Sequence, residues 1–474
     1  MDNKYPDWVI KHKKEKTAIH RIGNNYYLYE ITSKWDPELK RAKKITKAYL
    51  GAITKDGLKK PDSGKYMPST AIEYGSSAYL LNENQIVIEK LKKYFPEHYR
   101  EIFILSALRF FYQCPLKNIK ISYQDSWLSV DMAYARLSKD FLSHLLEVTG
   151  RRRENIVLFL KEFIGGAENL LVDLTHVFSQ SDDMILAEKG YNSKLDFSPQ
   201  INLLFIFSKD KKLPLFYRIL LGNVRDVSSL KATIEEAGIS DITIIADKGF
   251  YSEENITLLD KNNLKYIIPL KRNSSLIDLK ILKEGNKDSF DGYFKYKDRY
   301  IFCYKCPGYM PVFVFLDDEL KVKEQKDYLE RIESCPEFGY SMQNFKQKQY
   351  TFGTISLLSN LEESPQKIFS YFKSRAAIEQ AFDSFKNILD SDRTYMQNDY
   401  SMEGWMFINY LSLIYYYKVY HHLIEKDLLS RYSPLDVIFY LSKYRRVKIK
   451  DKWIDLEIPK QTRTLMEKLS IPIT

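Results

Sequence analysis

The stretch Phe372–Leu389, FKSRAAIEQAFDSFKNIL, has the spacing of one α-helix with a narrow charged stripe. At about 100° per residue, Arg375, Glu379 and Lys386 fall within roughly 40° of one another, and Phe372 lies on the same side within about 60°. The rest of the helix surface is mostly apolar. Because a solvated face usually scatters its charges, this pattern predicts a mostly buried helix whose charged stripe faces a specific partner.

Length and composition indicate a folded protein of about three domains. The chain has 474 residues, of which 45% are hydrophobic and 28% are charged. No apolar run approaches the roughly 20 residues that cross a bilayer, and the N-terminus lacks the apolar segment of a secretory signal. Four cysteines in a chain of this length do not make a disulfide framework. We therefore expect a cytoplasmic protein with no membrane partner.

The net charge of +10 is concentrated near the N-terminus. Residues 1–60 contain 15 Lys or Arg and 7 Asp or Glu, which is a surplus of 8. A basic block of this kind is typical of binding to a phosphate backbone. A solvated lysine-rich surface explains the charge equally well.

Residue patterns in the first third of the chain predict a hairpin followed by helices. Asn25–Thr32 and Lys43–Ile53 are β-rich and flank a polar connection that contains proline, which favours a small antiparallel unit. Residues 61–80 are rich in Pro, Gly and Ser and are typical of a linker. From Asn84 to about Ile164 the periodicity is mostly helical, and this region includes the basic segment RRREN.

From Glu168 onward the pattern changes to alternating strands and helices. Three strands (ENLLVDLTHVF, INLLFIFS and LPLFYRILL) are followed in order by a helix, a strand, a helix and a strand. Residues 276–350 mix short strands with a charged helix, and one more strand precedes the Phe372–Leu389 stretch. The C-terminal part is helical and aromatic, and then basic (KYRRVKIKDK).

Two aspartates occupy matching positions in this pattern. Asp173 and Asp247 each come directly after an apolar strand, in LLVD and IIAD, and we expect loop residues to follow each of them. Two carboxylates at neighbouring strand ends repel each other unless a cation lies between them, and Mg²⁺ prefers such oxygen ligands. Glu379 would complete the set. Taken singly, the aspartates also fit turn or cap residues, and Glu379 also fits a surface ion pair.

The combination resembles the DDE transposases of bacterial insertion sequences, in the group with the signature Y-(2)-R-(3)-E-(6)-K. The chain has Phe372-(2)-Arg375-(3)-Glu379-(6)-Lys386, so the spacing is intact and phenylalanine replaces tyrosine. Further motifs that resemble the family are Asp173-Leu-Thr175, Gly222-Asn223-Val-Arg-Asp226 and Asp247-Lys-Gly249-Phe250-Tyr251.

The resemblance implies an α/β fold: a ribonuclease H-like mixed sheet with flanking helices, interrupted by a β-rich insertion. An N-terminal β-hairpin and helical region would bind DNA. The expected units are a basic β-rich unit (1–60), a linker and helical region (61–165), the first half of the core (166–275), the insertion (276–350), the second half of the core with Glu379 (351–425) and a helical, basic tail (426–474).

The resemblance also implies phosphoryl transfer on DNA, with cleavage at the ends of a mobile element and strand transfer into a target. Asp173, Asp247 and Glu379 would bind two Mg²⁺ ions, with Mn²⁺ as a substitute. Arg375 and Lys386 would hold DNA phosphates. The expected partners are double-stranded DNA, namely terminal inverted repeats and target DNA, and a second copy of the chain in a homodimer.

Supporting roles are less specific. Asn223 would orient a strand or a water molecule, or serve only as a turn residue, and Phe372 replaces a tyrosine that would contact phosphate. Asp226 fits a helix cap better than a ligand. Residues 1–150, up to RRREN, are the candidates for binding the inverted repeats.

Two rival interpretations remain at this point. One is another metal-dependent enzyme, such as a ribonuclease H-like nuclease or a phosphatase, and the other is a DNA-binding relative that has lost catalysis. The pair Cys303 and Cys306 has zinc spacing, but no second pair follows, so we expect packed strand cysteines. We also expect His176 and the pair His421-His422 to be structural.

Overall fold

The computed structural model describes residues 5–472 apart from 37–40, 60–70, 165–169, 180, 182, 190–197, 209–210, 224–226, 239–242, 247, 335–339, 376–392, 395 and 450–451. For some other residues, Asp173 among them, it describes the backbone alone. Within this described part, none of the helices has the length and apolar character needed to cross a lipid bilayer.

The N-terminal unit is an antiparallel sheet in sequence order. It contains β1 (Thr17–Ile22), β2 (Asn25–Asp36), β3 (Arg41–Thr54) and β4 (Gly57–Lys59). Helix α1 (Asp7–Ile10) belongs to the same small core, which consists of Val9, Ile19, Leu28 and Ile53 and is separate from the main core of the molecule. The predicted hairpin is confirmed as β2 and β3, and β1 and β4 extend it on either side.

Of the predicted linker 61–80, residues 61–70 lie outside the described residues, and residues 71–80 are not a linker, which corrects the expectation from composition. They form β5 (Ile72–Glu73) and the start of helix α2 (Gly75–Glu83). The buried Glu73 carboxylate accepts the backbone N–H groups of Ser76 at 2.6 Å and Ser77 at 3.3 Å, which caps the helix. The small residues serve packing, because a Cβ at Gly75 would come within 2.2 Å of the Leu441 carbonyl oxygen.

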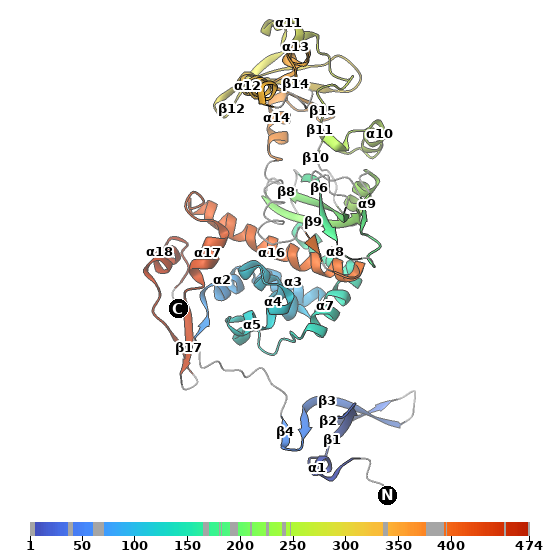
Figure 1. Ribbon diagram of the computed structural model, residues 1–474, viewed down its shortest axis with the longest axis vertical. Coiled ribbons are helices and arrows are strands. Elements are labelled where there is room, and N and C mark those ends of the chain that lie inside the picture. Colours follow the sequence, from blue (N-terminus) through green and yellow to red (C-terminus); the bar gives the residue numbers. More distant parts are fainter. Residues whose placement is uncertain are drawn as a thin grey trace.

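A layer of helices follows, as the periodicity predicts. Its members are α3 (Gln85–Tyr94), α4 (Tyr99–Tyr112), α5 (Ile119–Gln124), α6 (Leu128–Asp131), α7 (Lys139–Arg151) and α8 (Arg153–Ile164). Helix α16 (Asp399–Glu425), which comes much later in the chain, packs against α4 and α7. In Figure 1 this layer lies below the strands β8 and β9, and the C-terminal elements lie beside it, next to α2.

The main sheet contains 11 strands within the described residues. Its path is β12-β13-β14-β15-β11-β10-β6-β8-β7, with β9 paired to β8 and β16 paired to β6. The core strands are β6 (Leu170–Ser179), β7 (Glu188–Lys189), β8 (Pro199–Ser208), β9 (Leu213–Leu221), β10 (Thr243–Ile245) and β11 (Lys265–Pro269), with helices α9 (Val227–Ala237) and α10 (Glu253–Lys261) between the last three.

The strand order identifies the fold. The five strands β9, β8, β6, β10 and β11 lie side by side, so β6 is central although it comes first in the chain. Strand β10 runs parallel to both β6 and β11, whereas β8 is antiparallel to β6 and to β9. This mixed arrangement, with helices after β9 and β10, confirms the expected ribonuclease H-like core and the predicted order of elements.

The β-rich insertion extends the same sheet instead of forming its own. Strands β12 (Gly292–Tyr296), β13 (Arg299–Lys305) and β14 (Val312–Asp317) form an antiparallel meander. β15 (Thr354–Ser359) then joins β14 to β11. Helices α11 (Lys280–Glu284), α12 (Asp318–Ser334) and α13 (Met342–Lys348) accompany these strands, and Figure 1 shows this part at the far end of the sheet from β8 and β9.

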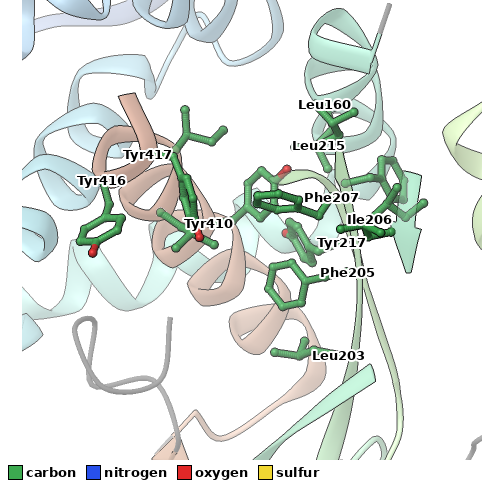
Figure 2. Close-up of a cluster of buried hydrophobic side chains, with 14 of the residues drawn as sticks. Leu160, Leu203, Phe205, Ile206, Phe207, Leu215, Tyr217, Tyr410, Tyr416 and Tyr417 are labelled. Atoms are coloured by element: carbon green, nitrogen blue, oxygen red, sulfur yellow. The ribbon is translucent and has the colours of Figure 1, made fainter. Parts of the chain in front are cut away.

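Helix α16 joins the sheet to the helical layer because it is apolar on nearly every side. Tyr410 lies 5.0 Å from Tyr217 and 6.2 Å from Phe205 between ring centroids, and Tyr417 lies 5.5 Å from Phe207. Figure 2 shows these rings between the helix and the strands β8 and β9. The expected aromatic helix is therefore confirmed, and the structure shows that it is a core element.

The crossing of α7 and α16 requires glycine on both helices. A Cβ at Gly150 would lie 1.8 Å from the Tyr400 carbonyl oxygen, and one at Gly404 would lie 2.0 Å from the Leu146 carbonyl oxygen. Neither glycine is explained by backbone conformation, since both lie within regular helix. Close approach of the two backbones is the reason for both residues.

An ion-pair network ties the same helix to its neighbours. Arg153, at the start of α8, donates to Glu403 of α16 at 2.7 Å and to Glu236 of α9 at 3.1 Å. It also donates to the Tyr217 carbonyl oxygen at 2.8 Å, and the Tyr217 hydroxyl donates to Glu403 at 2.9 Å. Burial, the Glu403 charge and the Tyr217–Glu403 hydrogen bond all raise the pKa of Tyr217, so the phenol stays protonated and remains a donor.

The C-terminal elements pack on the start of the helical layer. Helix α17 (Pro434–Leu441) leads to strands β17 (Arg445–Ile449) and β18 (Lys452–Asp455) and to helix α18 (Lys460–Lys468). Strand β17 pairs with both β18 and β5, so this end of the chain holds the segment that composition suggested was a linker.

We predict that Gly404→Ala destabilises the protein although alanine is the better helix former. The added methyl group would overlap the α7 backbone, and over-packing of this kind typically costs about 1–3 kcal/mol. The thermal unfolding midpoint should therefore fall. Gly292→Ala is the control, because nothing lies within 4 Å of the added carbon there. An unchanged or higher midpoint for Gly404→Ala would contradict the close crossing.

We also predict that Arg153→Met destabilises the protein by about 2–3 kcal/mol, because it removes the cation that Glu403 contacts at 2.7 Å and leaves Glu236 only the longer pair with Arg218 at 3.7 Å. Arg152→Met is the matched control, since the pair that Arg152 forms with Glu97 at 3.5 Å is exposed, and such pairs contribute about 0–1 kcal/mol. Denaturant titration of both variants measures the difference. Equal losses of stability would show that the network adds nothing.

Candidate catalytic site

Strand β6 carries the first candidate residue and is shared by three neighbours. One edge pairs with β8, and the backbone of Asp173 lies opposite Phe205. On the other edge, β10 pairs through Ile245 with Leu171, and β16 (Arg393–Thr394) pairs further along, beginning at Phe178. Between these two contacts, no strand of the described chain pairs with this edge. The backbone of Asp173 therefore lies at an interruption in the sheet.

This position corrects one expectation from the sequence. Asp173 does not end its strand, because β6 continues to Ser179 and the residues after Asp173 keep their pairing with β8. The run LTHVF that follows is β-forming, and it pairs with the beginning of β8. What changes near Asp173 is the pairing on the β10 edge alone.

The second aspartate lies just outside the described residues. Strand β10 ends at Ile245, and the N–H of the buried Ala246 donates to the Ile267 carbonyl oxygen of β11 at 3.2 Å. The next residue in the sequence is Asp247, and description resumes with a 3-10 turn at Lys248–Phe250. The predicted strand is confirmed, and the role of Asp247 stays a prediction.

The glutamate segment is bounded by two described elements. Helix α14 (Pro365–Lys373) precedes it, and β16 follows it. Residues 376–392, which include Glu379 and Lys386, lie outside the described residues, so their helical stripe stays a prediction. The chain nevertheless leaves α14 near the insertion and returns to β6, the strand that carries Asp173.

The expected continuous helix from Phe372 is wrong at its start. Helix α14 ends at Lys373, and the Ser374 hydroxyl donates to the Tyr371 carbonyl oxygen at 2.5 Å. Such a bond to the backbone competes with helix continuation. Arg375 lies in the following turn, where its N–H donates to the Phe372 carbonyl oxygen at 3.1 Å. Phe372 and Arg375 are therefore not on one uninterrupted helix.

A cluster of cations lies where α14 meets the insertion. Burial lowers the pKa of the Lys373 ammonium group, and the nearby charges of Arg299 and Lys297 lower it further. Arg299 is held by Asp317 at 2.5 Å. Sequence analysis missed this cluster, because Arg299 and Lys373 are far apart in sequence and only the packing of α14 on the insertion strands brings them together.

Asn223 is held by a neighbouring strand. Its amide group donates to the Glu188 carboxylate of β7. The preceding Gly222 lies so close to β8 that a Cβ would meet the Gln200 carbonyl oxygen at 1.9 Å. The Gly222 carbonyl oxygen in turn accepts the buried Asn202 amide at 2.9 Å. The Gly-Asn pair thus fixes the end of β9 against β8 and β7, which favours a structural role for Asn223.

The other motifs have structural explanations. Burial raises the pKa of the Cys303 thiol to about 11 and also raises that of Cys306, so both stay protonated. His421 bonds the Lys212 carbonyl oxygen at 3.0 Å, and His422 bonds the Tyr79 hydroxyl at 2.9 Å. His176 contacts Phe178 edge to face. In the described part of the chain, no three His, Cys, Asp or Glu side chains form a group that could hold a metal ion.

The basic segments RRREN and KYRRVKIKDK use their arginines within the protein. Arg151 pairs with Glu147 at 2.6 Å and Arg152 with Glu97, while Arg153 forms the network described above. In the second segment, Arg445 pairs with Asp125 at 2.6 Å, and Arg446 pairs with Asp455 and stacks on Tyr74. These arginines therefore have partners within the protein, and their basic sequence alone does not indicate DNA contact.

Comparison with solved structures finds transposases bound to DNA. One is a piggyBac transposase synaptic complex with hairpin DNA, at 13% identity and a TM-score of 0.37, covering 73% of this chain and 69% of that chain. Others are a pre-cleavage Mos1 transpososome, at 10% identity and 0.15 (34% of this chain, 57% of that chain), and the Drosophila P element transposase strand transfer complex, at 12% identity and 0.20 (72% and 85%). No curated protein matches the sequence.

The family assignment rests on a comparison with protein-family profiles. The profile described as "Transposase DDE domain" matches residues 169–415, which runs from the start of β6 through the insertion and the glutamate segment into α16. This region is more than half of the 474-residue chain. The match does not distinguish the group with the Y-(2)-R-(3)-E-(6)-K signature, which stays a prediction. The chain belongs to the DDE transposases, enzymes that carry out DNA transposition by cutting DNA and transferring the cut strands.

Proposed function

We propose that Asp173, Asp247 and Glu379 form the catalytic centre of this transposase and bind its divalent metal ions. The observation that carries the proposal is the parallel pairing of β6 and β10 at Leu171 and Ile245. In the sequence, Asp173 follows Leu171 by two positions, and Asp247 follows Ile245 by two positions. Because both aspartates follow paired residues of parallel strands by the same number of positions, we expect their carboxylates to be neighbours.

The interruption of pairing on β6 supports the same proposal. A metal centre needs room beside the strand that supplies its ligand, and β10 no longer pairs with β6 beyond Leu171 in the described chain. Ligands of open α/β sheets gather where neighbouring strands diverge in this way.

The proposed position of Glu379 follows from the flanks of its segment. The strand after the segment, β16, pairs with the same edge of β6 as β10 does, beginning at Phe178. Asp399, close behind β16, accepts the Leu186 N–H at 3.1 Å, and α16 then enters the core. The segment thus returns to the interrupted edge of β6, which is where a third carboxylate would be needed.

The chemistry of the three side chains fits a hard divalent ion. DDE transposases generally use divalent metal ions, and we propose two Mg²⁺ ions here, with Mn²⁺ able to substitute, because all three side chains are carboxylates. When bound, such ions activate a water molecule or a DNA 3′-hydroxyl and stabilise the leaving 3′-oxygen.

The cations near the site would bind the DNA backbone. We assign phosphate contacts to Arg375 through its fork of donors and to Lys386 as a point charge. Lys373 and Lys297, which lie where α14 meets the insertion, would add to these contacts, whereas Arg299 there is paired with Asp317. Phe372 replaces the tyrosine of the signature and lacks its hydroxyl, so no phosphate contact is assigned to it.

Two DNA ends must be processed together, and we propose that two copies of the chain assemble on the terminal inverted repeats and the target. Each copy would supply one catalytic centre. The basic residues of the N-terminal unit would supply affinity for the ends.

The carboxylate assignment predicts that Asp173→Asn, Asp247→Asn and Glu379→Gln each abolish cleavage of DNA carrying the element ends. Each change removes a metal-binding charge and keeps the side-chain volume, so end binding and the thermal midpoint should stay near wild type. Asp288→Asn is the control, because Asp288 is an exposed carboxylate of the insertion. If any of the three variants cleaves at the wild-type rate, its assignment as a ligand is wrong.

The same assay separates the transposase from a simple nuclease. Purified protein with Mg²⁺ should give products in which element ends are joined to target DNA, in addition to cut ends. Cutting without joining would favour a nuclease of the same fold.

A further inference from the structure

The hairpin of the N-terminal unit continues as a two-stranded ribbon beyond its sheet. Strand β1 pairs with residues 25–30 of β2. From Ile31 to Asp36, β3 residues 41–46 are the strand partner of β2, and the Ile31 N–H makes the last contact on the β1 side, to the Lys16 carbonyl oxygen at 2.8 Å. The register shifts that follow Leu28 and Glu30 in β2 lie where this ribbon begins. Such bulges increase strand twist and direct a ribbon away from the body of a sheet.

Both faces of this ribbon combine a cation with an exposed apolar side chain. Trp35 is 63% exposed and lies opposite Ala42, on the face that Lys44 shares through its pairing with Ser33. Ile45 is 40% exposed and lies on the other face, together with Arg41. Nothing in the described chain covers either face. The exposed Trp35 is the more informative of the two, because a surface that serves no binding function rarely exposes a tryptophan.

The ribbon cations differ from the other basic clusters of the chain. The arginines of RRREN and KYRRVKIKDK are engaged in ion pairs. Arg41 and Lys44 are exposed, and no described side chain forms an ion pair with either of them. Asp36 lies opposite Arg41 in the ladder, and its charge is included in the following count. Over residues 31–46 the sequence has five Lys or Arg and two Asp or Glu, which is a surplus of three positive charges. This uncompensated charge matches a phosphate backbone.

The dimensions of the ribbon select duplex DNA and its wider groove. Two paired strands lie about 4.8 Å apart, and with side chains the ribbon fits a major groove about 12 Å wide but not a minor groove about 6 Å wide. Antiparallel ribbons enter grooves in this way in other DNA-binding folds.

We propose that the ribbon formed by residues 31–36 and 41–46 is the element that enters the major groove of duplex DNA. Arg41 and Lys44 would contact phosphates or base edges from opposite faces, and Trp35 would pack against sugars or thymine methyl groups. This proposal rests on the proposed function, since it names the part of the chain that holds the DNA for the catalytic centre.

The test compares two double variants of the full chain in fluorescence anisotropy with a short labelled DNA duplex. Arg41→Ala with Lys44→Ala should lower affinity at least about tenfold at low salt and reduce the slope of log affinity against log salt by about 2. Lys55→Ala with Lys59→Ala is the control, because both lysines are exposed, belong to the same unit and lie at the other end of β3. It should retain most of the affinity.

Trp35→Ala should weaken binding with little change in the salt slope, because the side chain is uncharged. All four substituted cations and Trp35 are exposed, so thermal midpoints should stay near wild type. Wild-type affinity and salt slope for Arg41→Ala with Lys44→Ala would overturn the proposal. Equal loss in the control pair would also overturn it, because binding would then depend on total charge.

Two further outcomes separate this proposal from its alternatives. If Trp35→Asp converts a DNA-free dimer into a monomer and leaves DNA affinity unchanged, the ribbon is an interface between copies of the chain and the proposal is wrong. The catalytic proposal is judged separately, because Asp173→Asn should bind the duplex as wild type does whatever the ribbon variants do. Loss of cleavage in that variant would uphold the catalytic centre even if the ribbon proposal failed.

Discussion

The burial of helix α16 between a sheet and a layer of helices is the interaction that holds the core together and fixes the chain next to the proposed catalytic centre. Its tyrosines pack on Phe205, Phe207 and Tyr217 on one side, and its Gly404 meets the backbone of α7 on another. On the α4 side, the Ser412 hydroxyl donates to the Ser106 carbonyl oxygen at 2.8 Å. A helix held on several sides fixes the position of whatever immediately precedes it in the chain.

What precedes α16 is the end of the glutamate segment. Strand β16 pairs with β6 and is followed within a few residues by the start of the helix, where the Asn398 side chain caps the N-terminus. The rigid core therefore determines where the glutamate segment returns to the sheet. In this arrangement, the stability of the fold and the geometry of the proposed catalytic centre depend on the same packing.

The distribution of charge divides the basic residues into two classes. Arginines near the helical layer, such as Arg153 and Arg446, are buried or half-buried and are paired with carboxylates or stacked on aromatic rings. Their partners come from distant parts of the sequence. The exposed cations of the N-terminal ribbon have no such partners among the described residues. The net charge of +10 therefore does not by itself indicate where DNA would bind, because many of the basic residues form ion pairs within the protein.

Local patterns predicted much of the fold. Alternating apolar strands and helices from Glu168 to Leu270 gave the correct order of elements, because each core strand is apolar and bounded by polar turns. The end of α14 at Lys373 was not predictable from helical spacing, since Ser374 competes for a backbone carbonyl group. Composition predicts a linker at residues 71–80 because the small residues needed there for close packing resemble those of a flexible segment.

The candidate site could be predicted only in part. The resemblance of its motifs indicated the family, and the profile match over residues 169–415 confirms it. Sequence alone could not decide whether Asp173 ends its strand or lies within the run ENLLVDLTHVF, because this depends on how far β8 continues to pair with it. Nor could it show the cluster of Lys373, Arg299 and Lys297, which exists only because α14 packs on the insertion strands.

The central claim is that Asp173, Asp247 and Glu379 bind the same metal centre. The most direct measurement is the anomalous diffraction of Mn²⁺ in crystals of the protein bound to a DNA end. The account predicts Mn²⁺ peaks roughly 2.1 Å from carboxylate oxygens of all three residues. Peaks bound by other side chains, or a structure in which one of the three carboxylates lies too far away to share the centre, would contradict it.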